Sequence, residues 1–272
     1  MPIGQINMEG KDKVQVSIDR LREFEPEQGY YLAFSGGKDS EVIKQLAIEA
    51  GVKFDAHYNH TTVDPPELIY HMRKYHSDVI IDKPEITMWR LIEKRKFPPT
   101  GLMRYCCDKL KEGGGEGRVV ITGVRWAESA RRKNTREEIE IFNKSKSKKA
   151  EEQKRKFYDG DPDDKRRMME SCVTKGKFII NPIVDWENED VWEYIKSREI
   201  KYCSLYDEGF HRLGCIGCPM QGRKGMEREF ERWPKYRDAY VRTFERMLKT
   251  LDTSKQKNQW KTGEDVMQWW MR

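Results

Sequence analysis

The chain has 272 residues, of which 37% are hydrophobic and 36% are charged, and it carries a net charge of +6. Its eight Trp, twelve Tyr and ten Phe exclude a largely disordered chain, which would be poor in aromatic residues. No apolar run approaches the roughly 20 residues that a membrane-spanning helix needs.

The beginning of the sequence, Met1-Pro2-Ile3-Gly4, has no basic flank followed by an apolar stretch, so we expect no signal peptide. We therefore expect a cytoplasmic protein that makes no contact with a membrane. In that compartment the six cysteines should be reduced thiols or metal ligands rather than disulfides.

The first half of the chain alternates strand-like apolar runs with segments of helical periodicity. Gly29–Phe34 (GYYLAF) predicts a buried strand, and apolar residues then recur at helical spacing until Gly51 ends the helix. Further strands are expected at Lys53–Tyr58, Asp78–Asp82 and Arg118–Val124, and further helices at Pro65–Tyr75 and Thr87–Lys96. This alternation predicts an α/β fold with a doubly wound, mostly parallel sheet covered on both faces.

The pattern is lost between Ser129 and Glu170, where basic residues cluster, and we expect an inserted, mobile surface segment there. Beyond it, Lys177–Pro182 predicts a strand, and Asn188 is expected to cap the next helix. A long amphipathic helix is expected over Glu227–Leu251, with an interruption near Pro234.

The loop between the first strand and the first helix, Ser35-Gly36-Gly37-Lys38-Asp39-Ser40, predicts an anion site. Its glycines allow a tight turn that brings N–H groups against phosphate oxygens, and the helix N-terminus adds partial positive charge. Lys38 supplies a full positive charge, and Ser35 and Ser40 supply hydroxyl donors. Asp39 either caps the helix or helps to hold Mg²⁺.

This loop resembles the SGGxDS motif of the PP-loop adenine nucleotide α-hydrolases, which bind the pyrophosphate of ATP. Together with motifs further along the chain, it resembles the phosphoadenosine phosphosulfate (PAPS) reductase family over about residues 28–230. The further motifs are Cys106-Cys107, Gly123-Val124-Arg125 to Glu128-Ser129, Asn181-Pro182 to Asp185-Trp186, and Cys215-Ile216-Gly217-Cys218. The resemblance implies a PP-loop/HUP-like fold and an adenine nucleotide, either ATP or the sulfonucleotides PAPS and APS, as substrate.

Two features depart from the sulfonucleotide reductases of that family. Those enzymes end in a motif with a catalytic cysteine, whereas this chain has no cysteine after Cys218. Their phosphate loop is often degenerate, whereas this one is intact and keeps Lys38. Both features favour cleavage of ATP between the α- and β-phosphates, as in the sulfur-inserting and adenylating relatives.

The cysteines predict a metal centre. The pair Cys215-x-x-Cys218 lies in a glycine-containing loop that could wrap one metal centre. The adjacent pair Cys106-Cys107 resembles the iron–sulfur pattern of assimilatory adenylylsulfate reductases, which implies a [4Fe–4S] cluster on these four residues. Cys172 or Cys203 could replace one of the adjacent pair. Ligand type alone does not separate iron–sulfur from zinc, so zinc stays open.

Other candidates are expected around the nucleotide. Arg125 and Gly123 follow a predicted strand end, where open α/β sheets bind ligands. His60 and Asp64 lie just past the second strand and are candidates for nucleotide contact, with Asp64 also a candidate for Mg²⁺ or the ribose. Lys38, Asp39 and Arg125 are the candidate catalytic residues.

The expected organisation is one PP-loop domain over residues 1–250 and a tail over residues 251–272. Within the domain, residues 128–172 form a charged insertion, and residues 200–230 carry the cysteine-containing loop of a helical C-terminal part. We expect an ATP-dependent adenylating or sulfur-transferring enzyme, with a sulfur donor or reductant protein as a further partner. The alternatives are a sulfonucleotide reductase and a component of a modification complex that binds tRNA or DNA through Lys144 to Lys149 (KSKSKK).

Overall fold

The computed structural model describes residues 10, 12–142, 152, 155, 159, 177–251 and 260–272. These residues divide into two compact units. The first comprises the described residues within Met1–Tyr58, His71–Ile80 and Gly114–Phe210. The second comprises those within Asn59–Tyr70, Ile81–Gly113 and His211–Arg272. The phosphate loop lies in the first unit, and Cys106, Cys107, Cys215 and Cys218 lie in the second.

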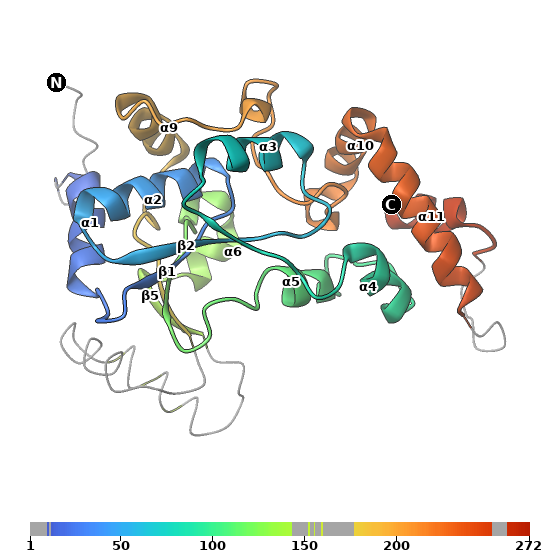
Figure 1. The fold of residues 1–272 in the computed structure, drawn as a ribbon, viewed down its shortest axis with the longest axis horizontal. Helices are drawn as coiled ribbons and strands as arrows, with labels where there is room; N and C mark the ends of the chain where they lie inside the picture. The colour runs from blue at the N-terminus through green and yellow to red at the C-terminus, as the bar shows by residue number, and fades with distance from the viewer. Residues whose placement is uncertain are drawn as a thin grey trace. The chain divides into compact units, whose positions relative to one another are not determined.

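A six-stranded sheet in the order β3-β2-β1-β4-β6-β5 forms the core of the fold. Its strands are β1 (Tyr30–Ala33), β2 (Phe54–Asn59), β3 (Ile80–Asp82), β4 (Val119–Ile121), β5 (Ile139–Phe142) and β6 (Lys177–Ile180). Neighbouring strands among β2, β1, β4 and β6 pair in parallel, and β5 pairs antiparallel with β6. Strands β1, β2 and β5 of this sheet are labelled in Figure 1. The prediction of an α/β fold with a mostly parallel sheet is confirmed.

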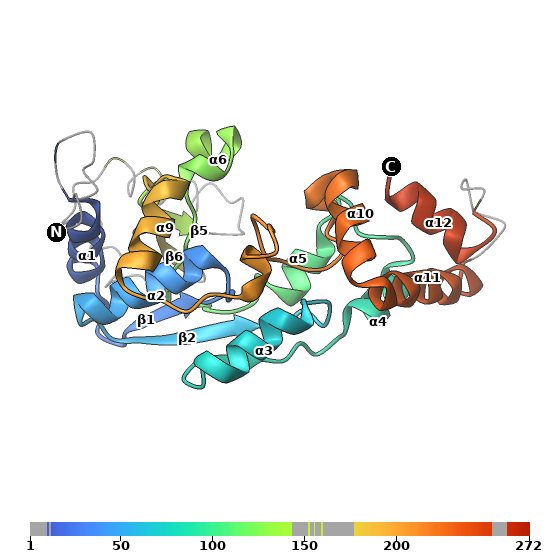
Figure 2. The same cartoon turned by 90° about the horizontal axis from the view of Figure 1, so that it is seen from above.

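Helix α2 (Lys38–Ala50) follows β1 directly and packs against α1 (Lys13–Glu23) and α9 (Asn188–Ser197) (Figure 2). Val42, Ile43, Leu46 and Ala47 of α2 are all fully buried. Gly51 ends the helix in the left-handed conformation, with φ 70°, as its position in the sequence predicts.

The loop before β4, which contains Gly114 and Gly115, packs against Tyr31 of β1 and Val120 of β4. A Cβ atom on Gly114 would lie 2.0 Å from Oη of Tyr31, and one on Gly115 would lie 2.8 Å from Cγ2 of Val120. Tyr31 also stacks on His57 of β2, with ring centroids 4.3 Å apart. Only residues without a side chain fit this close approach, so the glycines fix where the loop crosses the strands.

The irregular segment that we expected from Ser129 contains regular structure in its described part. Helix α6 (Ala130–Thr135) and the edge strand β5 lie within it, which corrects that prediction up to residue 142. The strand escaped prediction because it carries a charged residue inside the fold. Glu140 is 7% exposed and accepts hydrogen bonds from Arg136 (2.7 Å) and from Asn181 of the neighbouring segment (2.6 Å).

The start of α9 differs by one residue from the prediction. Glu187, rather than Asn188, is the N-cap residue, and its backbone N–H donates to Asp190 at 2.7 Å. Asn188 is the first residue inside the helix.

The second unit is mainly helical. It contains α4 (Met88–Arg95), α5 (Tyr105–Leu110), α10 (Gly222–Arg232), α11 (Pro234–Lys249) and α12 (Gly263–Trp270), and part of α3 (Pro66–Tyr75) also belongs to it. Helix α11 packs against α4, α10 and α12. The interruption predicted near Pro234 is present, because Pro234 starts a new helix. Within the part of the chain that the structure describes, no helix combines the length and apolarity that crossing a membrane requires.

A buried polar network joins α2 to α3 in the first unit. Oε1 of Glu41 lies 2.9 Å from Nε2 of both His71 and His76. Lys44, which is paired with Asp78, lies 3.1 Å from Nδ1 of His76. Since an ammonium group can only donate, Nδ1 of His76 is an acceptor and the ring proton sits on Nε2, facing Glu41. The ligand atoms of Glu41, His71 and His76 lie within 4.8 Å of one another, an arrangement that could also hold a metal ion.

Replacing Glu41 with alanine should destabilise the fold. The change leaves buried imidazole donors without an acceptor, at an expected cost of about 1–3 kcal/mol in the free energy of unfolding. Urea denaturation measures this cost, with Glu27→Ala as the control because Glu27 is exposed. Equal unfolding free energies for the two variants would contradict the network.

Candidate functional site

The phosphate loop forms a tight turn between β1 and α2. Gly36 has a φ of 70°, which favours glycine, and Gly37 is the N-cap residue of α2. No side chain of the helix caps this end. Oγ of Ser40 donates to the carbonyl of Gly37 at 2.7 Å and lies 3.2 Å from Oγ of Ser35. The hydroxyls of both serines therefore lie at the turn, and their role as donors to a phosphate stays a prediction.

Asp39 does not cap α2, because Gly37 occupies that position. Its carboxylate instead accepts from Nε of Arg125 at 2.7 Å and lies 3.4 Å from Nζ of Lys38. Arg125 is 3% exposed and also donates to the carbonyl of Trp186 at 3.1 Å. The three candidate catalytic residues therefore form one charged group, in which the carboxylate of Asp39 is already neutralised by two cations.

Gly123 allows this group to assemble. A Cβ atom on Gly123 would lie 3.1 Å from the backbone carbon and oxygen of Asp39. Because such a contact is tighter than a side chain normally tolerates, a glycine at this position lets the segment after β4 approach the first turn of α2. Arg125 follows two residues later and reaches Asp39 from there.

His60 and Asp64 belong to the second unit, whereas the phosphate loop belongs to the first. Both carboxylate oxygens of Asp64 accept from Thr61, one from the backbone N–H at 2.7 Å and one from the hydroxyl at 2.8 Å. Asp64 is 5% exposed, and Nε2 of His60 lies 3.8 Å from it. Asp64 thus stabilises the turn after β2 through its hydrogen bonds to Thr61. A contact between the nucleotide and His60 or Asp64 stays a prediction.

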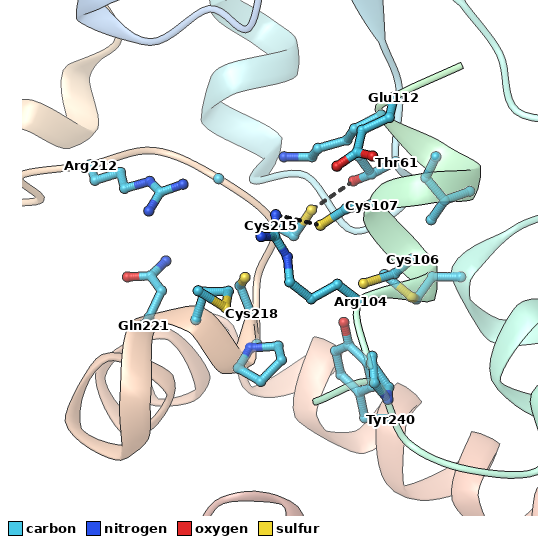
Figure 3. A pocket seen from close by; sticks show the side chains of 18 residues that line it. Thr61, Arg104, Cys106, Cys107, Glu112, Arg212, Cys215, Cys218, Gln221 and Tyr240 are labelled. Carbon is cyan, nitrogen blue, oxygen red and sulfur yellow. Dashed lines mark hydrogen bonds between the residues drawn. The ribbon is translucent and has the colours of Figure 1, made fainter. Parts of the chain in front are cut away.

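Four cysteines line one pocket of the second unit (Figure 3). Cys106 and Cys107 lie on the short helix α5, and Cys215 and Cys218 lie on the loop before α10. The cavity has a volume of about 140 Å³, far above the roughly 10–15 Å³ that a single water molecule needs. Arg104, Lys111 and Arg212 also line it. The pocket thus combines four thiols with three cations.

Positively charged side chains next to a thiol stabilise its negatively charged thiolate form. Nη2 of Arg104 lies 3.6 Å from Sγ of Cys107. The hydrogen bond from Cys106, supported by Arg104, lowers the pKa of Cys107 well below that of a free thiol. The charge of Cys215 in turn raises the pKa of Lys111. The hydrogen bond to Cys107, together with burial, raises the pKa of Cys106, and burial raises the pKa of Cys218. Among these three thiols, Cys107 is therefore the one whose surroundings favour the thiolate, which is the metal-binding form of cysteine.

The loop that carries Cys215 and Cys218 is clamped through its backbone. The N–H of Gly217 donates to Glu229 of α10 at 2.6 Å, the carbonyl of Ile216 accepts from Tyr240 at 3.0 Å, and the N–H of Ile216 donates to the carbonyl of Val63 at 2.8 Å. Glu229 is 4% exposed, and its burial raises its pKa to about 7. The neighbouring helices therefore fix the position of this loop.

The remaining cysteines differ in placement. Cys203 is fully buried in the first unit and does not line the pocket. Cys172 and the lysines from Lys144 to Lys149 lie outside the described residues. Sequence reasoning missed Arg104, Lys111, Arg212 and Glu229. Arg104 and Lys111 flank the cysteine pair closely enough in the sequence to have been found, whereas Glu229 gave no such signal.

Residues 29–221 match the model of the phosphoadenosine phosphosulfate reductase domain family. This match covers more than half of the chain, and the chain belongs to that family. The predicted family resemblance is confirmed.

Known relatives match the chain to different extents. An uncharacterized protein of Methanocaldococcus jannaschii is 27% identical over 225 residues, 79% of this chain and 47% of the relative. The adenosine 5'-phosphosulfate reductase of Oceanobacillus iheyensis is 38% identical over 52 residues, 19% of this chain and 22% of that enzyme. The chain thus spans about half or less of the length of these relatives. The solved PAPS reductase of Candida auris is 16% identical, with a TM-score of 0.44, and the match covers 78% of this chain and 96% of that one.

Gly217→Ala should disrupt the cysteine loop, whereas Gly214→Ala should not. Gly217 has a φ of 73°, and an added Cβ atom would lie 2.6 Å from Cζ of Phe230. Around Gly214, no atom lies within 4 Å of an added Cβ. We expect the Gly217 variant to lose more than about 1 kcal/mol of stability and most of any metal that the four cysteines bind. Thermal unfolding and metal analysis test this, and equal behaviour of the two variants would contradict it.

Proposed function

We propose that this protein binds ATP at Ser35–Ser40 and uses it to adenylate an acceptor for sulfur transfer, with a [4Fe–4S] cluster held by Cys106, Cys107, Cys215 and Cys218. The observation that carries the proposal is the intact phosphate loop at the N-terminus of α2. It combines a left-handed glycine, two serine hydroxyls and Lys38 at a helix end whose N-cap residue, Gly37, has no side chain to cap it. This arrangement suits the pyrophosphate of a nucleotide.

The proposed reaction has two steps. An acceptor oxygen attacks the α-phosphate of ATP, the bond to the bridging oxygen of the β-phosphate breaks, and pyrophosphate leaves. A sulfur nucleophile, hydrosulfide or its equivalent from a donor protein, then attacks the activated carbon and displaces AMP. Lys38 and the loop N–H groups would hold the leaving pyrophosphate, and Mg²⁺ bound with the nucleotide would offset its charge.

The Asp39–Arg125 pair would act as a positioning group in this scheme. Asp39 is bound to Arg125 and close to Lys38, so it is poorly suited to serve as a primary magnesium ligand. Its carboxylate would instead hold the ammonium of Lys38 over the loop. We therefore assign the metal contacts mainly to the phosphate oxygens of the nucleotide.

The spacing of the thiols supports a cluster over zinc. Tetrahedral zinc with Zn–S bonds of about 2.3 Å needs sulfur atoms about 3.8 Å apart. No three of Cys106, Cys107, Cys215 and Cys218, all described by the structure, bring their sulfur atoms within 4.8 Å of one another. A cubane spreads its ligands over separate iron atoms and suits such wider spacing and a cavity. When bound, the cluster would supply charge or a sulfur-binding iron, and the four thiolates would hold it.

A sulfonucleotide reductase is the second candidate. It is favoured by the relatives named adenosine 5'-phosphosulfate reductase, which share 37–40% identity with the chain over 52–60 residues. Release of pyrophosphate from ATP would support the adenylating enzyme, and release of sulfite from PAPS or APS would support the reductase. Salt-sensitive binding of tRNA or DNA without turnover would instead support a nucleic-acid-binding component of a modification complex.

Replacing Lys38 with alanine should weaken nucleotide binding about tenfold or more, because a charge-assisted phosphate contact is lost. Calorimetry with ATP and with PAPS measures the effect on both nucleotide classes. Lys196→Ala is the control, since Lys196 is exposed on α9 of the same unit. Unchanged affinity for every nucleotide in the Lys38 variant would exclude the loop as the phosphate site.

Protein purified without oxygen should be brown and contain about four irons and four sulfides per chain. Single alanine variants of Cys106, Cys107, Cys215 and Cys218 should lower the iron content, because each thiolate holds one corner of the cluster. Cys203→Ala is the matched control and should keep full iron, since Cys203 lies in the first unit. A colourless protein with one zinc and no acid-labile sulfide would refute the assignment.

A further inference from the structure

One side chain accepts a hydrogen bond from a backbone N–H group of the phosphate loop. Oη of Tyr206 accepts a hydrogen bond from the N–H of Lys38 at 2.8 Å, and Lys38 is the first residue of α2. This N–H is among those that have no partner within a helix and that bind anions at helix N-termini. A Cβ atom on Gly37 would lie 3.3 Å from the same oxygen. The hydroxyl therefore lies against the turn, at the position where a phosphate oxygen would accept from Lys38.

The fold holds Tyr206 at this position from two sides. Tyr206 ends a short 3₁₀ helix (Ser204–Tyr206), and its backbone N–H donates to the carbonyl of Cys203 at 3.1 Å. Its ring packs edge-on against Trp192 and Tyr202, with centroid distances of 5.3 and 6.2 Å. Burial raises the pKa of Tyr206, which keeps the phenol neutral. A neutral phenol is a weaker acceptor for this N–H than a phosphate dianion.

We propose that Tyr206 is a displaceable ligand of the phosphate loop, which a phosphate oxygen of the bound nucleotide must replace at the N–H of Lys38. This inference rests on the proposed nucleotide site and adds a residue that sets its affinity. An N–H makes one well-aligned hydrogen bond at a time, so the phenol and the phosphate compete for it. Breaking the tyrosine contact is then a cost of nucleotide binding, and removing the hydroxyl removes that cost.

Tyr206→Phe tests the inference, because it keeps the ring and removes only the hydroxyl. Calorimetric titration with pyrophosphate and with ATP should give a Kd roughly two- to tenfold lower than that of the wild type, the effect of one neutral hydrogen bond. Tyr202→Phe is the matched control. Its hydroxyl donates to Asp207 at 3.0 Å in the same aromatic cluster, and its Kd should not change.

Amide exchange gives a second readout that does not depend on affinity. Without ligand, the Lys38 amide should exchange faster in Tyr206→Phe than in the wild type, and saturating pyrophosphate should slow it to the same rate in both. Unchanged exchange, an unchanged Kd or weaker binding by Tyr206→Phe would overturn the inference while the phosphate site stands. Weaker binding would mean that the hydroxyl donates to the ligand. If neither protein bound pyrophosphate, both the inference and the phosphate site would be refuted.

Discussion

The backbone N–H groups in the first turn of α2 have no acceptors within the helix and point out of its end. Contacts from the surrounding structure of the first unit hold this end of the helix in place. Asp39 connects it to the segment after β4 through Arg125, and Glu41 connects it to α3 through His71 and His76. Since both links come from the first two turns of one helix, they fix its position relative to the sheet. The rigid position of α2 in turn fixes the direction of the N–H groups that would face a phosphate.

The loop of the second unit that carries Cys215 and Cys218 is held in place by hydrogen bonds to its backbone groups. Gly217 adopts a left-handed conformation that brings its N–H to the buried carboxylate of Glu229, while Tyr240 binds the preceding carbonyl. The thiols themselves take no part in these contacts. These backbone contacts therefore position Cys215 and Cys218 independently of their thiols, and the nearby cations Arg104 and Lys111 would offset the charge of thiolates at these positions.

The two candidate sites have different chemical requirements. A phosphate site needs fixed dipoles and a cation, which a strand–loop–helix unit supplies from adjacent residues. A polynuclear metal site needs ligands spread around a cavity, which one short segment does not supply. The four candidate ligands come from α5 and from the loop before α10, more than a hundred residues apart in the sequence. The residues of the phosphate loop are neighbours in the sequence, so the sequence predicts their arrangement directly. The four cysteines come from distant segments, so the sequence predicts the two pairs but not how they come together.

Sequence alone was enough for the strand–loop–helix unit, because the glycine turn, the helical periodicity and Gly51 all act between close neighbours in the chain. It also identified the two cysteine pairs by their spacing. Tertiary structure alone decided that Asp39 pairs with Arg125 instead of capping α2, that Cys203 does not line the pocket of Cys106, Cys107, Cys215 and Cys218, and that Ile139–Phe142 is a strand. Each of these depends on residues distant in the sequence, whose approach is set by packing and by the pairing of buried charges rather than by local conformational preference.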